Sequence, residues 1–179
     1  MTRCRLQAIV AADTIAFLLF GIWIERFESS FRARRLWYSV DMKGIKRLEK
    51  AEILKTAMRI VEGAKKSVKV TMLAKEEIRS PLPAKYFSLL KKKMASGVRV
   101  TRVGFGSNKE FTSLKTRVEI KSKNYQFYSV PKAGYQRMLL IDDAKLMYAN
   151  TAGKKQNFFY TEDPETVRKY GKYFKNTCR

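Results

Sequence analysis

Histidine is absent from the chain, and only two of its 179 residues are cysteines. The missing imidazole excludes Ser-His-Asp and Cys-His catalytic triads, histidine nucleophiles and histidine-ligated metal sites. Cys4 and Cys178 stand at opposite ends of the sequence, so they match neither a zinc-ligand spacing nor a disulfide framework. We therefore expect no metal and no cofactor, and any chemistry would fall to carboxylate, lysine or tyrosine side chains.

Glycine and proline are scarce, at 9 and 4 residues, and the 16 acidic residues are far outnumbered by 38 lysines and arginines. Apolar residues make up 45% of the chain, which is enough to bury a core. This composition excludes a wholly disordered chain and a collagen-like chain. The formal net charge of +22 indicates a polyanionic partner, either nucleic acid or an anionic lipid surface.

A long apolar run occupies residues 8–24. As a helix, the run would be roughly 26 Å long at about 1.5 Å per residue, near the lower limit for crossing a hydrocarbon core of about 30 Å. Asp13 lies within it, where a carboxylate is costly. The run fits three kinds of segment: a membrane-anchoring helix, a buried or oligomerising helix, and a cleaved signal peptide.

Orientation in a membrane would follow the basic residues on either side of this run. The heavier cluster comes after it, at Arg26, Arg32, Arg34 and Arg35. An anchored chain is therefore expected to keep its main domain on the cytoplasmic face of the membrane, and an unanchored chain is expected in the cytoplasm.

The sequence divides into residues 1–35, a hydrophobic helix followed by a basic linker, and residues 36–179, a single domain. The first 35 residues hold 6 of the 38 basic and 3 of the 16 acidic residues, which leaves 32 basic and 13 acidic residues in the domain. The positive charge thus belongs to the domain.

Apolar periodicity predicts the elements of this domain. The first half is expected to contain strands at 36–40, 68–73 and 98–103, with helices over 48–62 and 84–95. A run of short strands is expected at 117–121, 125–130, 137–141, 145–149 and 157–160. A last helix should begin after Asp163, with Pro164 in its first turn. Alternating strands and helices predict an α/β domain with parallel strand pairs.

Residues 135–143 read Tyr-Gln-Arg-Met-Leu-Leu-Ile-Asp-Asp. This segment resembles the H-x-K-x4-D motif of phospholipase D-like domains, with Tyr135 at the histidine position, Arg137 at the lysine position and Asp142 at the aspartate position. Asn150 falls in the place of the Gly-Ser/Thr-x-Asn segment that follows the motif. Residues 53–73, 91–103 and 161–165 are also similar to segments of the family, so the resemblance covers about 45–179.

The resemblance implies an α/β fold in which a phospholipase D-like sheet is flanked by helices, here preceded by the N-terminal hydrophobic helix. Family members attack a phosphodiester with one histidine and use a second as general acid, and they pair domains face to face, which implies a homodimer. Tyr135 has an ordinary pKa near 10 and is a poor substitute for histidine at neutral pH. The resemblance therefore implies a pseudo-enzyme whose pocket residues Tyr135, Arg137, Asp142 and Asn150 bind phosphate without catalysis.

Two other functions remain open at this point. Tyr135 could be the nucleophile of a divergent phosphodiesterase, with Arg137 and Asp142 assisting it. The chain could also be a basic structural subunit of an RNA-rich assembly. In a purely structural interpretation, Tyr135 covers the core and Asp142-Asp143 forms a turn.

Clusters of basic residues recur along the domain, and the surface charge is assigned to one set of them in particular: Lys91, Lys92, Lys93, Arg99 and Arg102. Aromatic residues are interleaved with polar ones at 124–128 and 157–160, as in proteins that stack nucleotide bases. Because these aromatics alternate at strand spacing, half of them are expected in the core. The surface predicts nucleic-acid binding without sequence reading.

Overall fold

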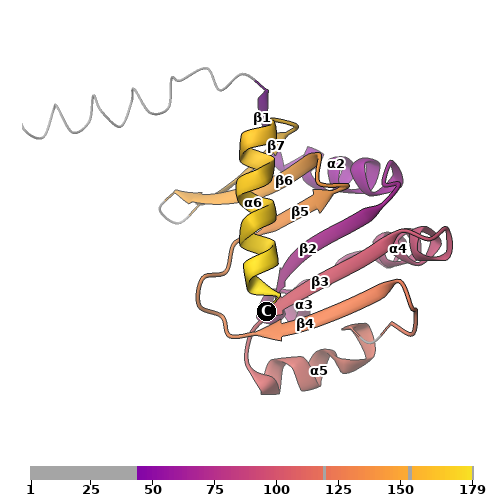
Figure 1. Cartoon of the computed structure of the whole chain (residues 1–179). Helices are drawn as coiled ribbons and strands as arrows, with labels where there is room; N and C mark the ends of the chain where they lie inside the picture. Colours follow the sequence, from indigo (N-terminus) through magenta and orange to yellow (C-terminus); the bar gives the residue numbers. More distant parts are fainter. Residues whose placement is uncertain (1–43, 119, 153–154, 179) are drawn as a thin grey trace, which may run out of the picture. The chain divides into compact units, whose positions relative to one another are not determined.

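A computed structural model describes residues 44–118, 120–152 and 155–178 of the chain (Figure 1). Within these residues, seven strands form one sheet in the order β1-β7-β6-β5-β2-β3-β4. β2 (Ser67–Leu73), β3 (Arg99–Phe105) and β4 (Tyr125–Val130) are parallel to one another. The other strands pair antiparallel, namely β1 (Ile45–Leu48), β5 (Met138–Ile141), β6 (Lys145–Ala152) and β7 (Lys155–Thr161). The expected α/β domain with parallel pairs in its first half is confirmed.

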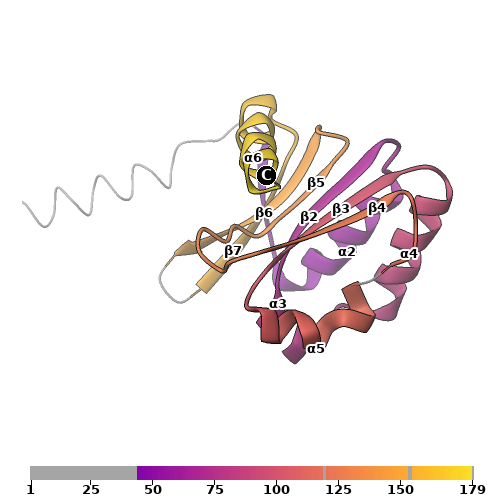
Figure 2. The same ribbon diagram turned by 60° about the horizontal axis from the view of Figure 1, so that its bottom comes forward.

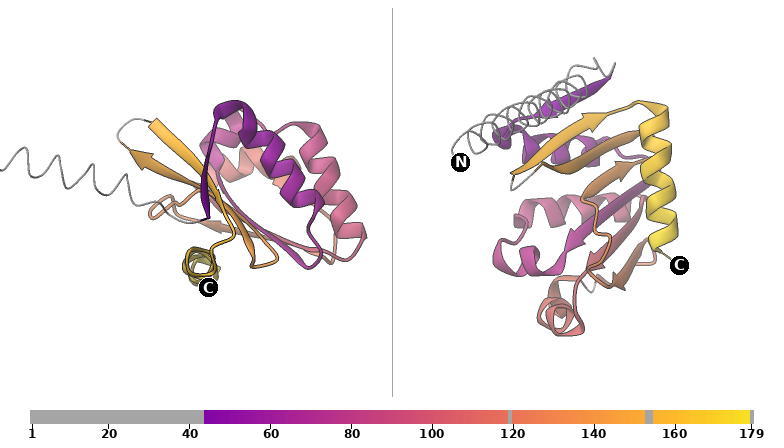
Figure 3. Two further views of the ribbon diagram at one scale, coloured as in Figure 1. Left: turned by 90° about the horizontal axis from the view of Figure 1, so that it is seen from above. Right: turned by 90° about the vertical axis from the view of Figure 1, so that its left-hand side faces the viewer.

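Helices cover both faces of this sheet. α2 (Lys50–Glu62) and α4 (Ala84–Ala95) pack on one face, and α6 (Pro164–Thr177) packs on the other, as Figure 2 and the left panel of Figure 3 show. α3 (Ala74–Arg79) and α5 (Asn108–Val118) follow β2 and β3, and they lie together at the carboxyl ends of the parallel strands. Two main apolar clusters result, one beneath α2 and α4 and one beneath α6.

Local sequence explains where the main helices begin and end. In α4, Tyr86, Leu90 and Met94 recur at helical spacing and are buried against the sheet. The chain leaves α4 through Gly97, whose φ of +91° is easily adopted by glycine. In α6, the Asp163 carboxylate accepts a 2.7 Å hydrogen bond from the Thr166 N–H, so the predicted N-cap is confirmed.

The structure differs from the sequence predictions in three described places. The strand predicted at 117–121 is not found among its described residues: residues 117 and 118 belong to α5, and residues 120 and 121 are outside any strand. This helix is held by tertiary contacts, because Leu114 is buried beside Ala74 and Phe111 packs on Phe127. β1 ends at Leu48, where the first helix was predicted to begin, and neither α3 nor α5 was predicted as a helix.

Two further predictions, the apolar helix at 8–24 and the strand at 36–40, lie outside the described residues. Among the helices that the structure describes, none combines the length and apolar character needed to span a membrane.

Candidate functional sites at the motif and beside the last helix

Tyr135 and Arg137 lie together just before β5, as the motif predicts. The Arg137 Nε–H donates a 3.2 Å hydrogen bond to the Tyr135 hydroxyl. The Arg137 guanidinium also forms an ion pair with Glu76 of α3 and lies 5.7 Å from the centre of the Phe158 ring. The cation at the family's lysine position is therefore already matched by a carboxylate of the same chain.

The environment of Tyr135 opposes ionisation of its phenol. Burial raises its pKa above the ordinary value, and the neighbouring Tyr173 adds to the effect. The ring packs 5.1 Å from the centre of the Phe105 ring and joins the apolar cluster beneath α6. A nucleophile that attacks phosphorus at neutral pH needs a lowered pKa or an adjacent base. The Tyr135 ring is thus packed against the core, and it also lines an adjacent pocket.

A pocket of about 430 Å³ opens beside these two residues. Its wall is largely apolar and includes Ile53, Leu82, Leu139 and Met147, with Arg137 and Glu76 among its few charged groups. Neither Asp142 nor Asn150 lines it. The pocket is apolar where a phosphate site would offer several hydrogen-bond donors.

Asp142 lies at the opposite end of β5 from Tyr135 and Arg137. Its carboxylate accepts hydrogen bonds from three consecutive backbone N–H groups, those of Lys65 at 2.8 Å, Lys66 at 2.7 Å and Ser67 at 2.7 Å. Asp142 follows Arg137 by five residues, with β5 between them, which corresponds to about 16 Å along an extended strand. The expectation that Asp142 assists Tyr135 is therefore wrong, because the strand holds the two side chains apart.

The turn predicted at Asp142-Asp143 is confirmed. Both residues have positive φ, at 54° and 53°, and the Ala144 N–H donates to the Ile141 carbonyl at 3.0 Å. Positive φ at both central positions is the arrangement of a type I′ turn, which aspartate tolerates better than most residues. The two carboxylates have different partners: that of Asp142 binds backbone N–H groups, and that of Asp143 binds the Lys69 ammonium.

Asn150 is exposed on β6, opposite Asn157 of β7 and beyond the last β5–β6 pair. The structure therefore brings only Tyr135 and Arg137 together from the four predicted pocket residues. Sequence reasoning missed Glu76, which neutralises Arg137, and Tyr173, whose hydroxyl accepts from the Gln136 N–H and donates to the Gly134 carbonyl. Both come from helices distant in sequence, and no local signal marks them.

Of the five residues assigned to an electrostatic surface, three are exposed, one is half-buried and one is buried. Lys91, Lys92 and Arg99 are exposed, and the half-buried Lys93 donates to the Ala64 carbonyl at 2.8 Å. The assignment of Arg102 to this surface is wrong, because Arg102 is only 2% exposed. Residues 99 and 102 are three positions apart on β3, so their side chains point to opposite faces of the sheet. Arg102 lies on the face that α4 covers. Its guanidinium lies 5.3 Å from the centre of the Phe87 ring.

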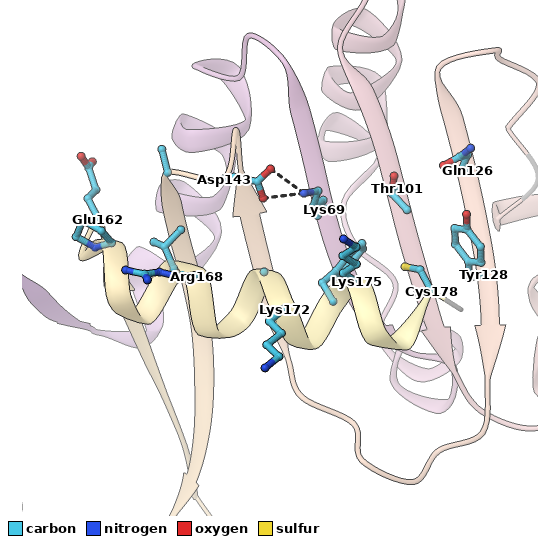
Figure 4. Close-up of a pocket in the computed structure, with 15 residues that line it drawn as sticks. Lys69, Thr101, Gln126, Tyr128, Asp143, Glu162, Arg168, Lys172, Lys175 and Cys178 are labelled. Carbon is cyan, nitrogen blue, oxygen red and sulfur yellow. Dashed lines mark hydrogen bonds and ion pairs between the residues drawn. The ribbon is translucent and has the colours of Figure 1, made fainter.

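A second and larger cavity, which the sequence did not reveal, lies between α6 and the sheet (Figure 4). We call it the α6 groove; its volume is about 960 Å³. Four cations line it: Lys69 of β2 and Arg168, Lys172 and Lys175 of α6. Thr101 of β3 and Gln126 and Tyr128 of β4 also line it, as do the carboxylates of Asp143 and Glu162 and the thiol of Cys178.

Most of the positive charge of the α6 groove is unneutralised. Asp143 forms an ion pair with Lys69, whose Nζ lies 2.7 and 2.8 Å from the two carboxylate oxygens of Asp143. Glu162 pairs with Lys145 at 3.7 Å, outside the groove. Arg168, Lys172 and Lys175 form no ion pair within the part of the chain that the structure describes. The groove is therefore suited to an anionic ligand.

Metal binding finds no support in the described residues, which contain no group of three or more cysteine, aspartate or glutamate side chains placed to hold an ion. The α6 groove instead offers cations, two hydroxyls and one amide.

Comparison with known proteins shows the fold and leaves the family open. No family model and no curated protein matches the sequence. The solved structures similar to this chain include TrmBL2, an archaeal chromatin protein, with 13% sequence identity and a TM-score of 0.58 over 94% of this chain. They also include NucT from Helicobacter pylori, with 18% identity and a TM-score of 0.51, covering 74% of this chain and 92% of NucT.

The similarity to NucT shows that the described domain shares the fold of that protein. The chain spans 65% of the length of the TrmBL2 chain. The structure of TrmBL2 is described as showing a novel mode of DNA binding.

Proposed function

We propose that this chain is a non-catalytic phospholipase D-like module that binds nucleic acid. One observation carries the proposal: the motif cation Arg137 is occupied by Glu76, whereas cations beside α6 remain free for an external anion. The excess of 32 basic over 13 acidic residues in 36–179 would make binding strong and strongly salt-dependent.

The comparison with TrmBL2 supports this proposal, because a protein with the same fold is described as binding DNA. The closed environment of Tyr135 supports the absence of catalysis, since burial opposes formation of the phenolate. An anionic lipid surface, a homodimer, anchoring through residues 8–24 and a cytoplasmic location remain predictions from the sequence.

Competition between polyanions tests the binding proposal. The full chain is titrated by fluorescence anisotropy, in a buffer without detergent, with a labelled 30-nucleotide single strand, the same sequence as a duplex, and vesicles of 30% phosphatidylserine. We expect nucleic acid to outcompete the vesicles at equal phosphate concentration. Between 50 and 200 mM salt its affinity should fall about a thousandfold, as for a protein that contacts about six phosphates. Vesicles that displace the nucleic acid would contradict the proposal.

Catalysis is tested separately at Tyr135. We expect no hydrolysis of bis(p-nitrophenyl) phosphate or of a labelled oligonucleotide above a protein-free control, and the same result for Tyr135→Phe. Hydrolysis that is lost in Tyr135→Phe would establish the divergent phosphodiesterase instead. The variant retains the packing of the ring on Phe105, so an effect would report the hydroxyl alone.

A further inference from the structure

We infer that the α6 groove is the site that holds the nucleic acid, and that it takes a single strand whose phosphates lie along α6 and one of whose bases stacks on Tyr128. This inference rests on the proposed function and assigns it a site and a class of ligand.

The cations of α6 are arranged along one side of the helix. Residues 168, 172 and 175 are spaced by four and three positions, which places their backbone positions on one side of α6. In Figure 4 the side chain of Lys175 points toward Lys69, whereas that of Lys172 extends in the opposite direction. Together the three positions cover about 10 Å along the helix axis. Val167 and Phe174 anchor α6 to the sheet, so the charged row is held at a fixed place beside the groove.

The floor of the groove is a part of the sheet that α6 leaves uncovered. Gln126 and Tyr128 are two residues apart on β4 and therefore point to the same face, where Thr101 of the neighbouring β3 also lies (Figure 4). Gln126 is exposed, and its amide can both donate and accept hydrogen bonds. An aromatic ring and an amide beside a row of cations are the groups that single-strand binding proteins use.

A single strand fits this arrangement better than a duplex or a lipid surface. The bases of a duplex are stacked on one another and paired, so a duplex could touch the α6 cations only through its backbone. Lipid headgroups carry no base to stack on Tyr128. A base that is free of a stack can enter the groove while its flanking phosphates stay on α6.

Matched lysine variants test the location. Lys172→Ala/Lys175→Ala removes two exposed helical lysines of the groove, and Lys91→Ala/Lys92→Ala removes two exposed lysines of α4. Both variants change the net charge equally. We expect the groove pair to weaken single-strand binding about tenfold and to lower the salt slope by about one or more, whereas the α4 pair weakens it about twofold or less. Equal losses in the two variants would overturn the inference.

Substitution of Tyr128 tests the stacking role. Tyr128→Leu keeps an apolar side chain against the core, and Tyr128→Phe keeps the aromatic ring. We expect Tyr128→Leu to weaken single-strand binding at least about fivefold, with duplex binding unchanged and Tyr128→Phe close to wild type. A similar loss for single strand and duplex, or no loss, would overturn the assignment of a base to Tyr128.

Cys178 provides a probe inside the groove that needs no substitution in it. A Cys4→Ser chain leaves Cys178 as the single thiol, whose pKa is raised by burial, so alkylation by iodoacetamide is followed at pH 8.5. We expect a saturating single strand to slow alkylation at least fivefold. If the strand binds but alkylation is unchanged, the groove is excluded while the proposed function stands. If wild type binds no nucleic acid, the proposed function itself fails.

Discussion

Asp142→Asn is expected to lower the free energy of unfolding by about 2–3 kcal/mol, measured by urea denaturation at pH 7. Three backbone N–H groups from Lys65, Lys66 and Ser67 converge on the Asp142 carboxylate. Hydrogen bonds to a charged acceptor contribute about 1.5–3 kcal/mol each, and water recovers part of the loss at this partly exposed loop. Asparagine tolerates the positive φ of this position, so the variant isolates the loss of charge and of one acceptor oxygen.

Asp143→Asn is the matched control, because Asp143 has the same positive φ and belongs to the same turn. Its carboxylate binds the Lys69 ammonium at the surface, so we expect a change within about 0.5 kcal/mol. Equal effects of the two variants would show that the turn, and not the backbone contacts, determines the stability.

The contribution of Asp142 should also depend on pH. Burial alone would raise its pKa, but the three backbone donors outweigh burial and hold the pKa below its usual value. A carboxylate with a lowered folded-state pKa stabilises the fold fully above its unfolded pKa of about 3.9, and this contribution is lost as the pH falls through the folded-state pKa. The difference between wild type and Asp142→Asn should therefore be largest at neutral pH and shrink below about pH 4.

Strands with clear alternation and helices with clear boundaries were predictable from the sequence. Residues 84–95 were predicted as a helix and form α4, since a proline precedes the helix and Gly97 follows it. The strand predicted at 117–121 failed because its short alternation is outweighed by contacts of α5 with Ala74 and Phe127, which are distant in sequence. The local pattern of apolar and polar residues cannot reveal contacts with residues that are distant in sequence.

The candidate site was predictable only where its residues are close in sequence. Tyr135 and Arg137 are two positions apart along an extended segment, so their contact follows from the motif. The partner of Arg137 is Glu76, on a helix that the sequence did not reveal. The α6 groove depends on where the last helix docks, and its lysines look like any other solvated helix face in the sequence.

Arg99 and Arg102 lie on the same strand, but Arg99 is exposed and Arg102 is buried, because side chains alternate between the two faces of the sheet. Arg102 is 2% exposed, and Glu77 of α3 is 6% exposed. Burial raises the pKa of Tyr86 to about 12, while the charge of Arg102 lowers this pKa and that of Glu77 raises it. Both charges therefore lie near the Tyr86 hydroxyl, and we expect them to compensate each other in the core.

Arg102→Met is expected to destabilise the fold by about 3–5 kcal/mol, because it would leave the Glu77 carboxylate buried without this compensating charge. Arg102→Met/Glu77→Leu should recover most of that loss, since a buried ion pair replaced by apolar side chains of similar size is often neutral. Urea denaturation of wild type, both single variants and the double variant gives the coupling energy.

Additive effects in this cycle would show that the two charges are not coupled. Arg99→Met, on the same strand but exposed, is the control and should change stability within about 0.5 kcal/mol. The double variant should bind nucleic acid with the salt slope of wild type, because a guanidinium beneath α4 contacts no phosphate. The basic residues of this chain would then divide into those that act on a partner and those that stabilise the core, a division set by strand parity and helix docking and not by net charge.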